Sequence, residues 1–373
     1  MNELTLHPNV YATGQSKGLI SLLERVWVRE HTPGDGVIYV MSGFANYNGG
    51  VRFFDTFRKH SENGGEIIAI FSGSTSFRLT SKQVVSEMLR CGARVHVINR
   101  KRLLHAKCYG SKTSLGNSLV VTSGNFTGPG MSQNVEMSVL LEPSSTAPMG
   151  FSWNALLDNI LAQKWDIYQP TLSNLTAPAW KLLYDEQASD ITLDESEDVT
   201  IVLRLSHADT ARINAIPGTN EAKGTQYFWI SKDCYDFFPP LTIRNQRGSK
   251  ATYSCLINMH YIDIDKIDTE CRVTFEAENN LDFRIGTGIL RYSHLANVGD
   301  LVAISRVGER DYELRLYRNG SPEYTLLMPY AVHFIGHQGK KYGYLSNADF
   351  AKLIDSKVGA NVKKQRHKII SAV

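Results

Sequence analysis

The sequence predicts two domains of different fold class, an α/β domain followed by an all-β domain. Three observations indicate this. Apolar runs alternate with helix-like stretches through residues 1–165, the pattern breaks over residues 166–199, and short strand-like runs fill residues 200–373. A chain of 373 residues is long enough for two domains that each bury a core of their own.

Strand-like and helix-like segments follow one another in the first 165 residues. Spacing of apolar residues near 3.6 predicts helices at 19–30 and 82–92, and Gly92 is a good helix stop. Such alternation favours a layered α/β fold with a largely buried sheet. Apolar runs predict its strands at 37–44, 66–73, 93–99, 103–110, 118–126 and 135–141.

The stretch 166–199 has the composition of an interdomain linker. It contains QPTLSNLTAPAW, rich in Pro, Ser, Thr and Asn, and the acidic cluster LDESED at 193–198. Beyond it, runs such as QYFWISK and YELRLYR alternate with Gly, Asn, Asp and Pro. This texture predicts a β-barrel or sandwich in residues 200–373.

Composition and charge are those of an ordinary soluble globular protein, with 42% hydrophobic residues, 21% charged residues and a net charge of +3. Any nucleic-acid surface must therefore arise from local charge. The N-terminus lacks the charged and apolar regions of a signal peptide, and no apolar run approaches the length of a membrane span. We expect a cytoplasmic protein with no membrane partner.

Five scattered cysteines without a Cys-x-x-Cys pair indicate free thiols rather than disulfides or a zinc site: Cys91, Cys108, Cys234, Cys255 and Cys271.

One constellation of residues indicates chemistry. His105 and Lys107 are one residue apart in a predicted strand, so their side chains share a face. Asn125, within Ser123-Gly124-Asn125, ends the next apolar run, and Glu136 opens the one after it. Three consecutive strands thus bring these groups to one end of a sheet.

This set of groups suits phosphoryl transfer. An imidazole can attack phosphorus and form a covalent intermediate. A cation and an amide N–H stabilise the charge on the non-bridging oxygens. A carboxylate fixes the orientation and tautomer of the histidine. None of these steps needs a metal ion, so we expect no metal and no cofactor.

The residues His105-Ala106-Lys107 and Ser123-Gly124-Asn125 resemble the signature of the phospholipase D superfamily. The usual aspartate five residues beyond the lysine is Lys112 here, so Glu136 is expected to take the orienting role. Longer stretches, among them HPNVYATG, SGFANYNGG, GTQYFW and YDFFPPLTIRN, resemble the BfiI/BmrI-type Type IIS restriction endonucleases.

This resemblance implies an α/β phospholipase-D-like nuclease domain and an all-β, B3-like pseudobarrel that recognises DNA. It also implies cleavage of double-stranded DNA without Mg²⁺, at a fixed offset from an asymmetric site such as ACTGGG.

The single His-x-Lys motif predicts a homodimer. Transfer through a histidine needs a second acid/base group, and none of the other ten histidines has a lysine two residues later. The second imidazole must therefore come from another chain, and a two-fold axis would place both His105 side chains around one phosphate. We expect the first domain to form this dimer.

Two further sets of residues are candidates for roles in DNA binding and control. The acidic cluster of the linker is expected to lie in the catalytic cleft as a mimic of DNA until the target is bound; it consists of Asp194, Glu195, Glu197 and Asp198. A solvated connector is the simpler interpretation of the same residues. Neutralising the four side chains tests the mimic, because unchanged cleavage of non-cognate DNA would contradict it. The expected DNA-reading residues, on loops of the second domain, are Arg212, Trp229, Arg247, Arg272, Asn279 and Lys340, although Trp229 could equally belong to the core.

Two other functions remain open at this point. One is a lipid or small-phosphodiester hydrolase of the same superfamily. The other is a DNA-binding regulator in which the first domain serves only for dimerisation. Conversion of His105 to alanine separates the last of these from a nuclease.

Overall fold

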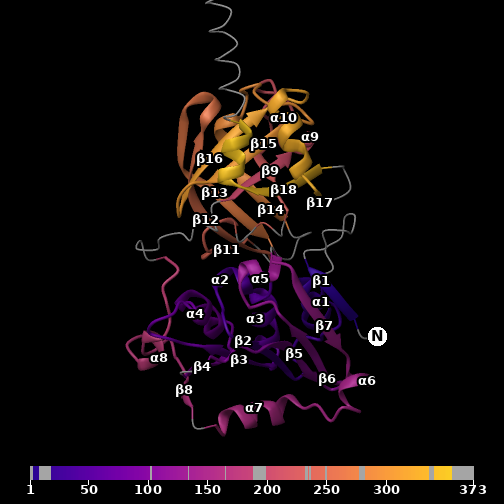
Figure 1. Ribbon diagram of the computed structural model, residues 1–373, viewed down its shortest axis with the longest axis vertical. Coiled ribbons are helices and arrows are strands. Elements are labelled where there is room, and N and C mark those ends of the chain that lie inside the picture. Colours follow the sequence, from indigo (N-terminus) through magenta and orange to yellow (C-terminus); the bar gives the residue numbers. More distant parts are fainter. Residues whose placement is uncertain are drawn as a thin grey trace, which may run out of the picture.

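The computed structural model shows two domains, drawn one above the other in Figure 1. Each is built on one sheet. No helix in the described part of the chain is long and apolar enough to span a membrane. The structure describes residues 3–7, 18–100, 103–132, 134–163, 165–187, 199–231, 234, 237–247, 250–276, 282–335 and 340–354.

The first domain contains an eight-stranded mixed sheet in the order β1-β7-β6-β5-β2-β3-β4-β8. Strands β2, β3 and β4 run parallel, and the other pairs are antiparallel. The central strands read VIYVMS and EIIAIFS because both faces of the sheet are covered. The strands are β1 (Glu3–His7), β2 (Val37–Ser42), β3 (Glu66–Ser72), β4 (Arg94–Asn99), β5 (Lys107–Thr113), β6 (Gly116–Thr122), β7 (Glu136–Leu141) and β8 (Asp166–Tyr168).

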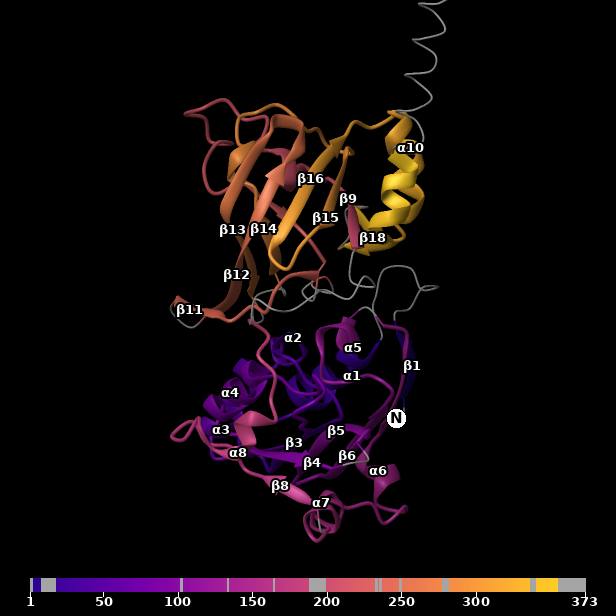
Figure 2. The same ribbon diagram turned by 60° about the vertical axis from the view of Figure 1, so that its left-hand side comes forward.

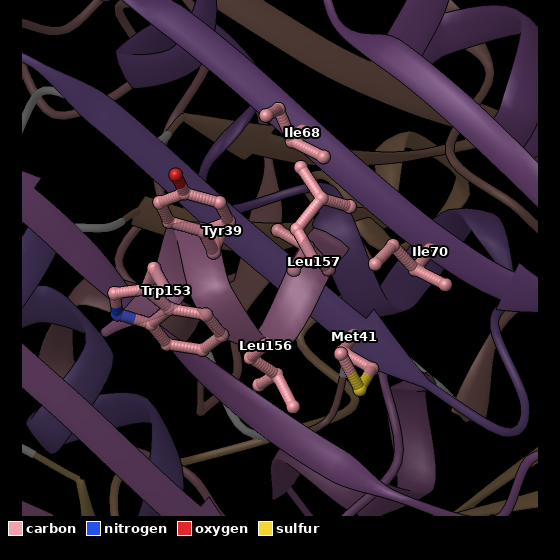
Figure 3. Close-up of a pocket in the computed structure, with 8 residues that line it drawn as sticks. Tyr39, Met41, Ile68, Ile70, Trp153, Leu156 and Leu157 are labelled. Carbon is pink, nitrogen blue, oxygen red and sulfur yellow. The ribbon is translucent and has the colours of Figure 1, made fainter. Parts of the chain in front are cut away.

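Alternate residues of the central strands enter two separate cores. Ile38 and Val40 of β2 pack in the core that includes Val84 of α4. On the other face, Tyr39 stacks on Trp153 of α7 with ring centroids 4.6 Å apart (Figure 3). The junction shown there has no room for a water molecule, so it is a packed layer and not a ligand site. The helical segments are α1 (Leu19–Glu24), the π-helical turn η1 (Arg25–Arg29), α2 (Tyr47–Gly50), α3 (Phe54–Glu62), α4 (Lys82–Arg90), α5 (Gly128–Ser132), α6 (Pro143–Thr146), α7 (Trp153–Leu161) and α8 (Pro178–Lys181).

Five of the six predicted strands begin within two residues of the observed start, and the sixth begins late. The run predicted from residue 103 enters the sheet only at Lys107. Before that point the Leu104 carbonyl oxygen accepts the Ser72 hydroxyl at 2.8 Å. Residues 103–106 therefore cross the end of β3, outside the ladder, and His105 precedes the strand on which it was expected.

Residues 166–187, expected to be linker, pack on the first domain. β8 pairs with β4, and the Ser74 amide donates to the Leu182 carbonyl at 2.9 Å. Tyr184 exchanges backbone hydrogen bonds with Thr80 and Lys82. The expected boundary at 165 therefore separates this packed segment from the domain on which it packs. The acidic cluster, with Asp194, Glu195, Glu197 and Asp198, lies outside the described residues.

The second domain is all-β, as predicted, with a ten-stranded sheet in the order β10-β14-β13-β12-β16-β15-β9-β18-β17, and with β11 paired to β12. Only the β12–β16 pair in this described sheet is parallel. A B3-like pseudobarrel remains a prediction. The strands are β9 (Val199–Arg204), β10 (Tyr227–Trp229), β11 (Ile243–Arg247), β12 (Lys250–Tyr261), β13 (Lys266–Glu276), β14 (Asp282–Gly286), β15 (Leu301–Arg306), β16 (Asp311–Tyr317), β17 (His333–Ile335) and β18 (Lys340–Ser346). The helical segments are α9 (His207–Thr210), η4 (Ile262–Ile264), η5 (Gly288–Leu290), α10 (Pro322–Leu327) and η6 (Met328–Tyr330).

Candidate active site and DNA-binding face

Strand directions bring the motif residues to one end of the first sheet. Ser42, the last residue of β2, pairs with Lys107, the first residue of β5. β5 is antiparallel to β6, and β6 is antiparallel to β7. The last residues of β6 and the first residues of β7 therefore lie at the end of the sheet where β5 begins. This places Asn125 and Glu136 beside Lys107.

His105 and Lys107 are in direct contact. The Lys107 Nζ lies 3.0 Å from His105 Nδ1 and 3.1 Å from Nε2, and it donates to the His105 carbonyl oxygen at 3.0 Å. Lys107 is buried whereas the imidazole is exposed. The buried lysine therefore contacts the solvent-facing imidazole from the protein interior, although His105 itself precedes the strand.

Burial lowers the pKa of Lys107, and the nearby Glu136 carboxylate partly opposes this effect. Glu136 thus favours the charged form of the buried lysine that contacts the imidazole. Lys112, where the superfamily usually has aspartate, pairs with Val37 near the other end of β5. Five residues of strand correspond to about 16 Å, so Lys112 does not replace a group of this site.

Glu136 is held by two polar side chains. Its Oε2 accepts a short hydrogen bond from the Ser123 hydroxyl, and its Oε1 accepts from Asn134 Nδ2 at 3.1 Å. The Ser123 Oγ also accepts the Met137 amide at 3.1 Å. Among the described contacts, none joins Glu136 to His105 of the same chain, so the expected orienting hydrogen bond is not formed within one chain. Asn134 was not anticipated, because an exposed asparagine in a turn carries no distinctive sequence signal.

Asn125 is anchored to the end of β2. Its Oδ1 lies 3.5 Å from the Ser42 hydroxyl, and the same hydroxyl accepts the Phe126 amide at 2.9 Å. The neighbouring Gly43 has no room for a side chain, since a Cβ there would lie 2.7 Å from the Leu104 carbonyl oxygen. Ser42 is thus a site residue missed from the sequence, where it reads as the end of an apolar strand.

In the second domain, several expected DNA-reading residues gather on one face of the sheet. Trp229 of β10 pairs with Arg284 of β14, which pairs with Thr274 of β13. The Arg284 guanidinium lies 6.0 Å from the Trp229 ring and 5.3 Å from the Tyr227 ring. Paired residues project to the same face. Arg284 was missed because an arginine inside a strand resembles any surface arginine.

Arg272 and Arg212 border this face. Arg272 of β13 donates to the Ser254 hydroxyl at 2.9 Å. The Arg212 guanidinium lies 5.7 Å from the Tyr227 ring and donates to the Lys223 carbonyl at 2.8 Å. Asn279 lies outside the described residues. Arg247 ends β11, but its side chain also lies outside them.

Lys340 does not occupy the exposed position expected of a DNA-reading residue. Its side chain is 5% exposed, and its Nζ lies 2.7 Å from each carboxylate oxygen of the buried Asp209. It also donates to the Trp229 carbonyl oxygen. The ammonium therefore serves the interior of the domain, where it neutralises a buried carboxylate, and is unavailable to a base in this structure.

No group of three or more His, Cys, Asp or Glu side chains in the described ranges is placed to hold a metal ion.

Residues 193–357 match the family model described as the DNA-binding domain of the metal-independent restriction enzyme BfiI. This part of the chain is similar to the BfiI DNA-binding domain family. The resemblance to BfiI-type restriction enzymes is thereby confirmed.

Solved structures show only a distant likeness. The chain is 12% identical to Nuc, a phospholipase D family member from Salmonella typhimurium, over 46% of this chain and 99% of that one, with a TM-score of 0.33. It is 12% identical to NucT from Helicobacter pylori over 43% and 95%, with a TM-score of 0.31. The N-terminal domain of Helicobacter pylori LlaJI.R1 is 13% identical over 39% and 97%, with a TM-score of 0.24. No curated protein matches the chain.

Proposed function

We propose that this protein is a metal-independent Type IIS restriction endonuclease of the phospholipase D superfamily. The observation that carries this proposal is the contact between His105 and Lys107 at the sheet end that also bears Asn125 and Glu136. The BfiI-type domain on the same chain supports DNA as the substrate. Together these observations support a phosphoryl-transfer site and a DNA-binding domain in one protein.

The proposed reaction has two displacements at one phosphate. In the first, a ring nitrogen of His105 attacks phosphorus, the bond from phosphorus to the 3′ oxygen breaks, and that oxygen takes a proton from His105 of the partner subunit. In the second, water attacks the phosphohistidine and gives its proton to the partner's His105. The phosphorus–nitrogen bond then breaks, leaving a 5′-phosphate and a 3′-hydroxyl.

The other site residues stabilise charge and geometry. Lys107 and the Asn125 amide are placed to bind the non-bridging oxygens as charge grows on them. The contact of Glu136 with Ser123 keeps the carboxylate next to the ammonium of Lys107 without a metal ion. In this scheme the protein supplies every group the reaction needs.

Exposed apolar side chains around the site support a homodimer formed by the first domain. Four of them lie within two residues of His105, Ser123 or Glu136 along the chain, and they are between 41% and 59% exposed. Apolar side chains clustered at a surface commonly mark a protein interface. A two-fold axis there would pair two half-sites into one. These side chains are Leu103, Val121, Val135 and Met137.

The aromatic and arginine face of the second domain supports readout of a G-rich site such as ACTGGG. Arginine binds the O6 and N7 atoms of guanine with two hydrogen bonds. Arg284, held between Tyr227 and Trp229, and Arg272 of the neighbouring strand are the arginines placed for this task. We further propose that the acidic linker cluster occupies the cleft until cognate DNA displaces it, and that the enzyme works in the cytoplasm.

Plasmid cleavage in excess EDTA, followed by sequencing of the cut ends, tests the proposal. We expect cuts at a fixed distance from one asymmetric site, because neither the attacking group nor the charge-stabilising groups need a metal. Cutting only after addition of Mg²⁺ would contradict the histidine mechanism. Specific binding without cutting under either condition would favour the regulator instead.

A further inference from the structure

The short helix α2 lies between the active-site segment and the second domain. Figures 1 and 2 both show it at the side of the first domain that faces β11. It contains Asn48, an asparagine that is 5% exposed. A polar side chain buried at a domain boundary must be satisfied by hydrogen bonds, which ties it to its partners.

Asn48 bonds to the backbone of the second domain with both ends of its carboxamide. Its Nδ2 donates to the Phe238 carbonyl at 3.4 Å, and its Oδ1 accepts the Leu241 amide at 3.2 Å. Phe238 is itself fixed, since its ring packs on Phe283 and Tyr312 with centroids 5.7 Å and 5.6 Å away. Among side chains of this length only a carboxamide both donates and accepts in this way.

The opposite side of α2 is fitted to the segment that follows Asn125. A Cβ on Gly49 would lie 2.1 Å from the Phe126 carbonyl oxygen, so the two backbones touch. Asn46 caps α2 through Gly49, accepts the Gly128 amide at 3.0 Å and donates its own amide to Phe126 at 3.0 Å. Movement of α2 therefore moves the backbone on which Asn125 is carried.

We propose that Asn48 is a positioning residue. Through its hydrogen bonds, the position of the second domain fixes the position of α2, and α2 in turn fixes the position of Asn125. This rests on the proposed nuclease function. Asn125 is the amide that stabilises charge on the phosphate, and a displacement of about 1 Å at such a group can cost on the order of 100-fold in rate. The position of the second domain on α2 thus affects the chemistry through the backbone that carries Asn125.

The matched test compares Asn48→Asp with Tyr253→Phe. The first variant keeps the size of the side chain and the bond to Leu241 but loses the donor to Phe238. The second loosens the same domain boundary at α3 instead of α2, because the Tyr253 hydroxyl donates to Asp55 at 2.7 Å and accepts from Arg58 at 2.8 Å. Thermal unfolding of both variants verifies that they are folded.

Two rates are measured in EDTA, turnover of bis(p-nitrophenyl) phosphate and single-turnover cleavage of a duplex with the mapped site. Both are measured again on an Asn125→Ala background. We expect Asn48→Asp to lower both rates at least 10-fold with the Kd for the duplex changed less than 3-fold. Tyr253→Phe should change the rates less than 3-fold. On the Asn125→Ala background Asn48→Asp should have no further effect, since residues that act through one another are not additive.

Equal losses in both variants, or an additive loss on the Asn125→Ala background, would show that Asn48 only holds the domains together and would overturn the inference. A parent protein that hydrolyses the small diester but cuts no DNA would overturn the restriction function alone, and the comparison of variants on the diester would still decide the role of Asn48. A parent inert toward both substrates would overturn the nuclease function and the inference with it.

Discussion

Replacing His105 with alanine is expected to abolish DNA cleavage, with a loss of at least about 10³-fold, while specific DNA binding is retained. The loss is large because the variant removes both the nucleophile of one chain and the acid/base group that the same residue supplies to its partner. Binding is retained because the proposed recognition face, with Arg272 and Arg284, belongs to the other domain. Cleavage of the mapped duplex and its Kd are measured side by side.

His260→Ala is the matched control, because His260 contacts Asp265 at the surface of the second domain at 3.1 Å, remote from the first sheet. It should cut at the parental rate. Detection of an acid-labile, alkali-stable phosphoenzyme in the parent, absent from His105→Ala, would support the covalent step. Cleavage by His105→Ala within 10-fold of the parent would sink the proposed mechanism.

Replacing Met137 with aspartate is expected to yield an inactive monomer. The side chain is 58% exposed beside Glu136, so the substitution is tolerated by the fold but places a charge in the proposed interface. A lone chain lacks the second imidazole, and general acid–base catalysis is worth about 10²–10⁴-fold. Light scattering after size-exclusion chromatography and cleavage at the same protein concentration measure the two effects together.

Two variants separate dissociation from added charge. Met149→Asp introduces the same charge at a side chain that is 66% exposed outside the proposed interface, and it should remain dimeric and active. Met137→Gln adds polarity without charge and should weaken the dimer less, with cleavage recovered as the protein concentration rises. A monomeric parent that is fully active would overturn the shared-site scheme.

Periodicity predicted the central sheet well because its signal is local. β2 and β3 are buried on both faces, so their sequences are apolar from end to end and mark their own limits. β1 and β8 were missed since a short edge strand is defined by its partner: β8 (Asp166–Tyr168) exists through its pairing with β4. Proline and serine nearby made the same residues resemble a linker.

The His-x-Lys and Ser-x-Asn elements were found because their members are close in sequence. Ser42 and Asn48 were not, since their partners lie far along the chain: Ser42 meets Phe126, and Asn48 meets Phe238. Lys340 shows the opposite failure. A lysine next to a turn reads as exposed, and only the packing of Asp209 beneath it makes it an interior ion pair.

By itself the sequence determined that an α/β domain precedes an all-β domain, and it predicted the set of reacting groups and a shared site in a dimer, because each depends on residue types and on spacing within a few positions. The tertiary structure alone decided how Lys107 supports a histidine outside the strand, which arginines share a face with Trp229, and how α2 joins the domains. Those features depend on hydrogen bonds and packing between segments distant in the chain, which no local pattern encodes.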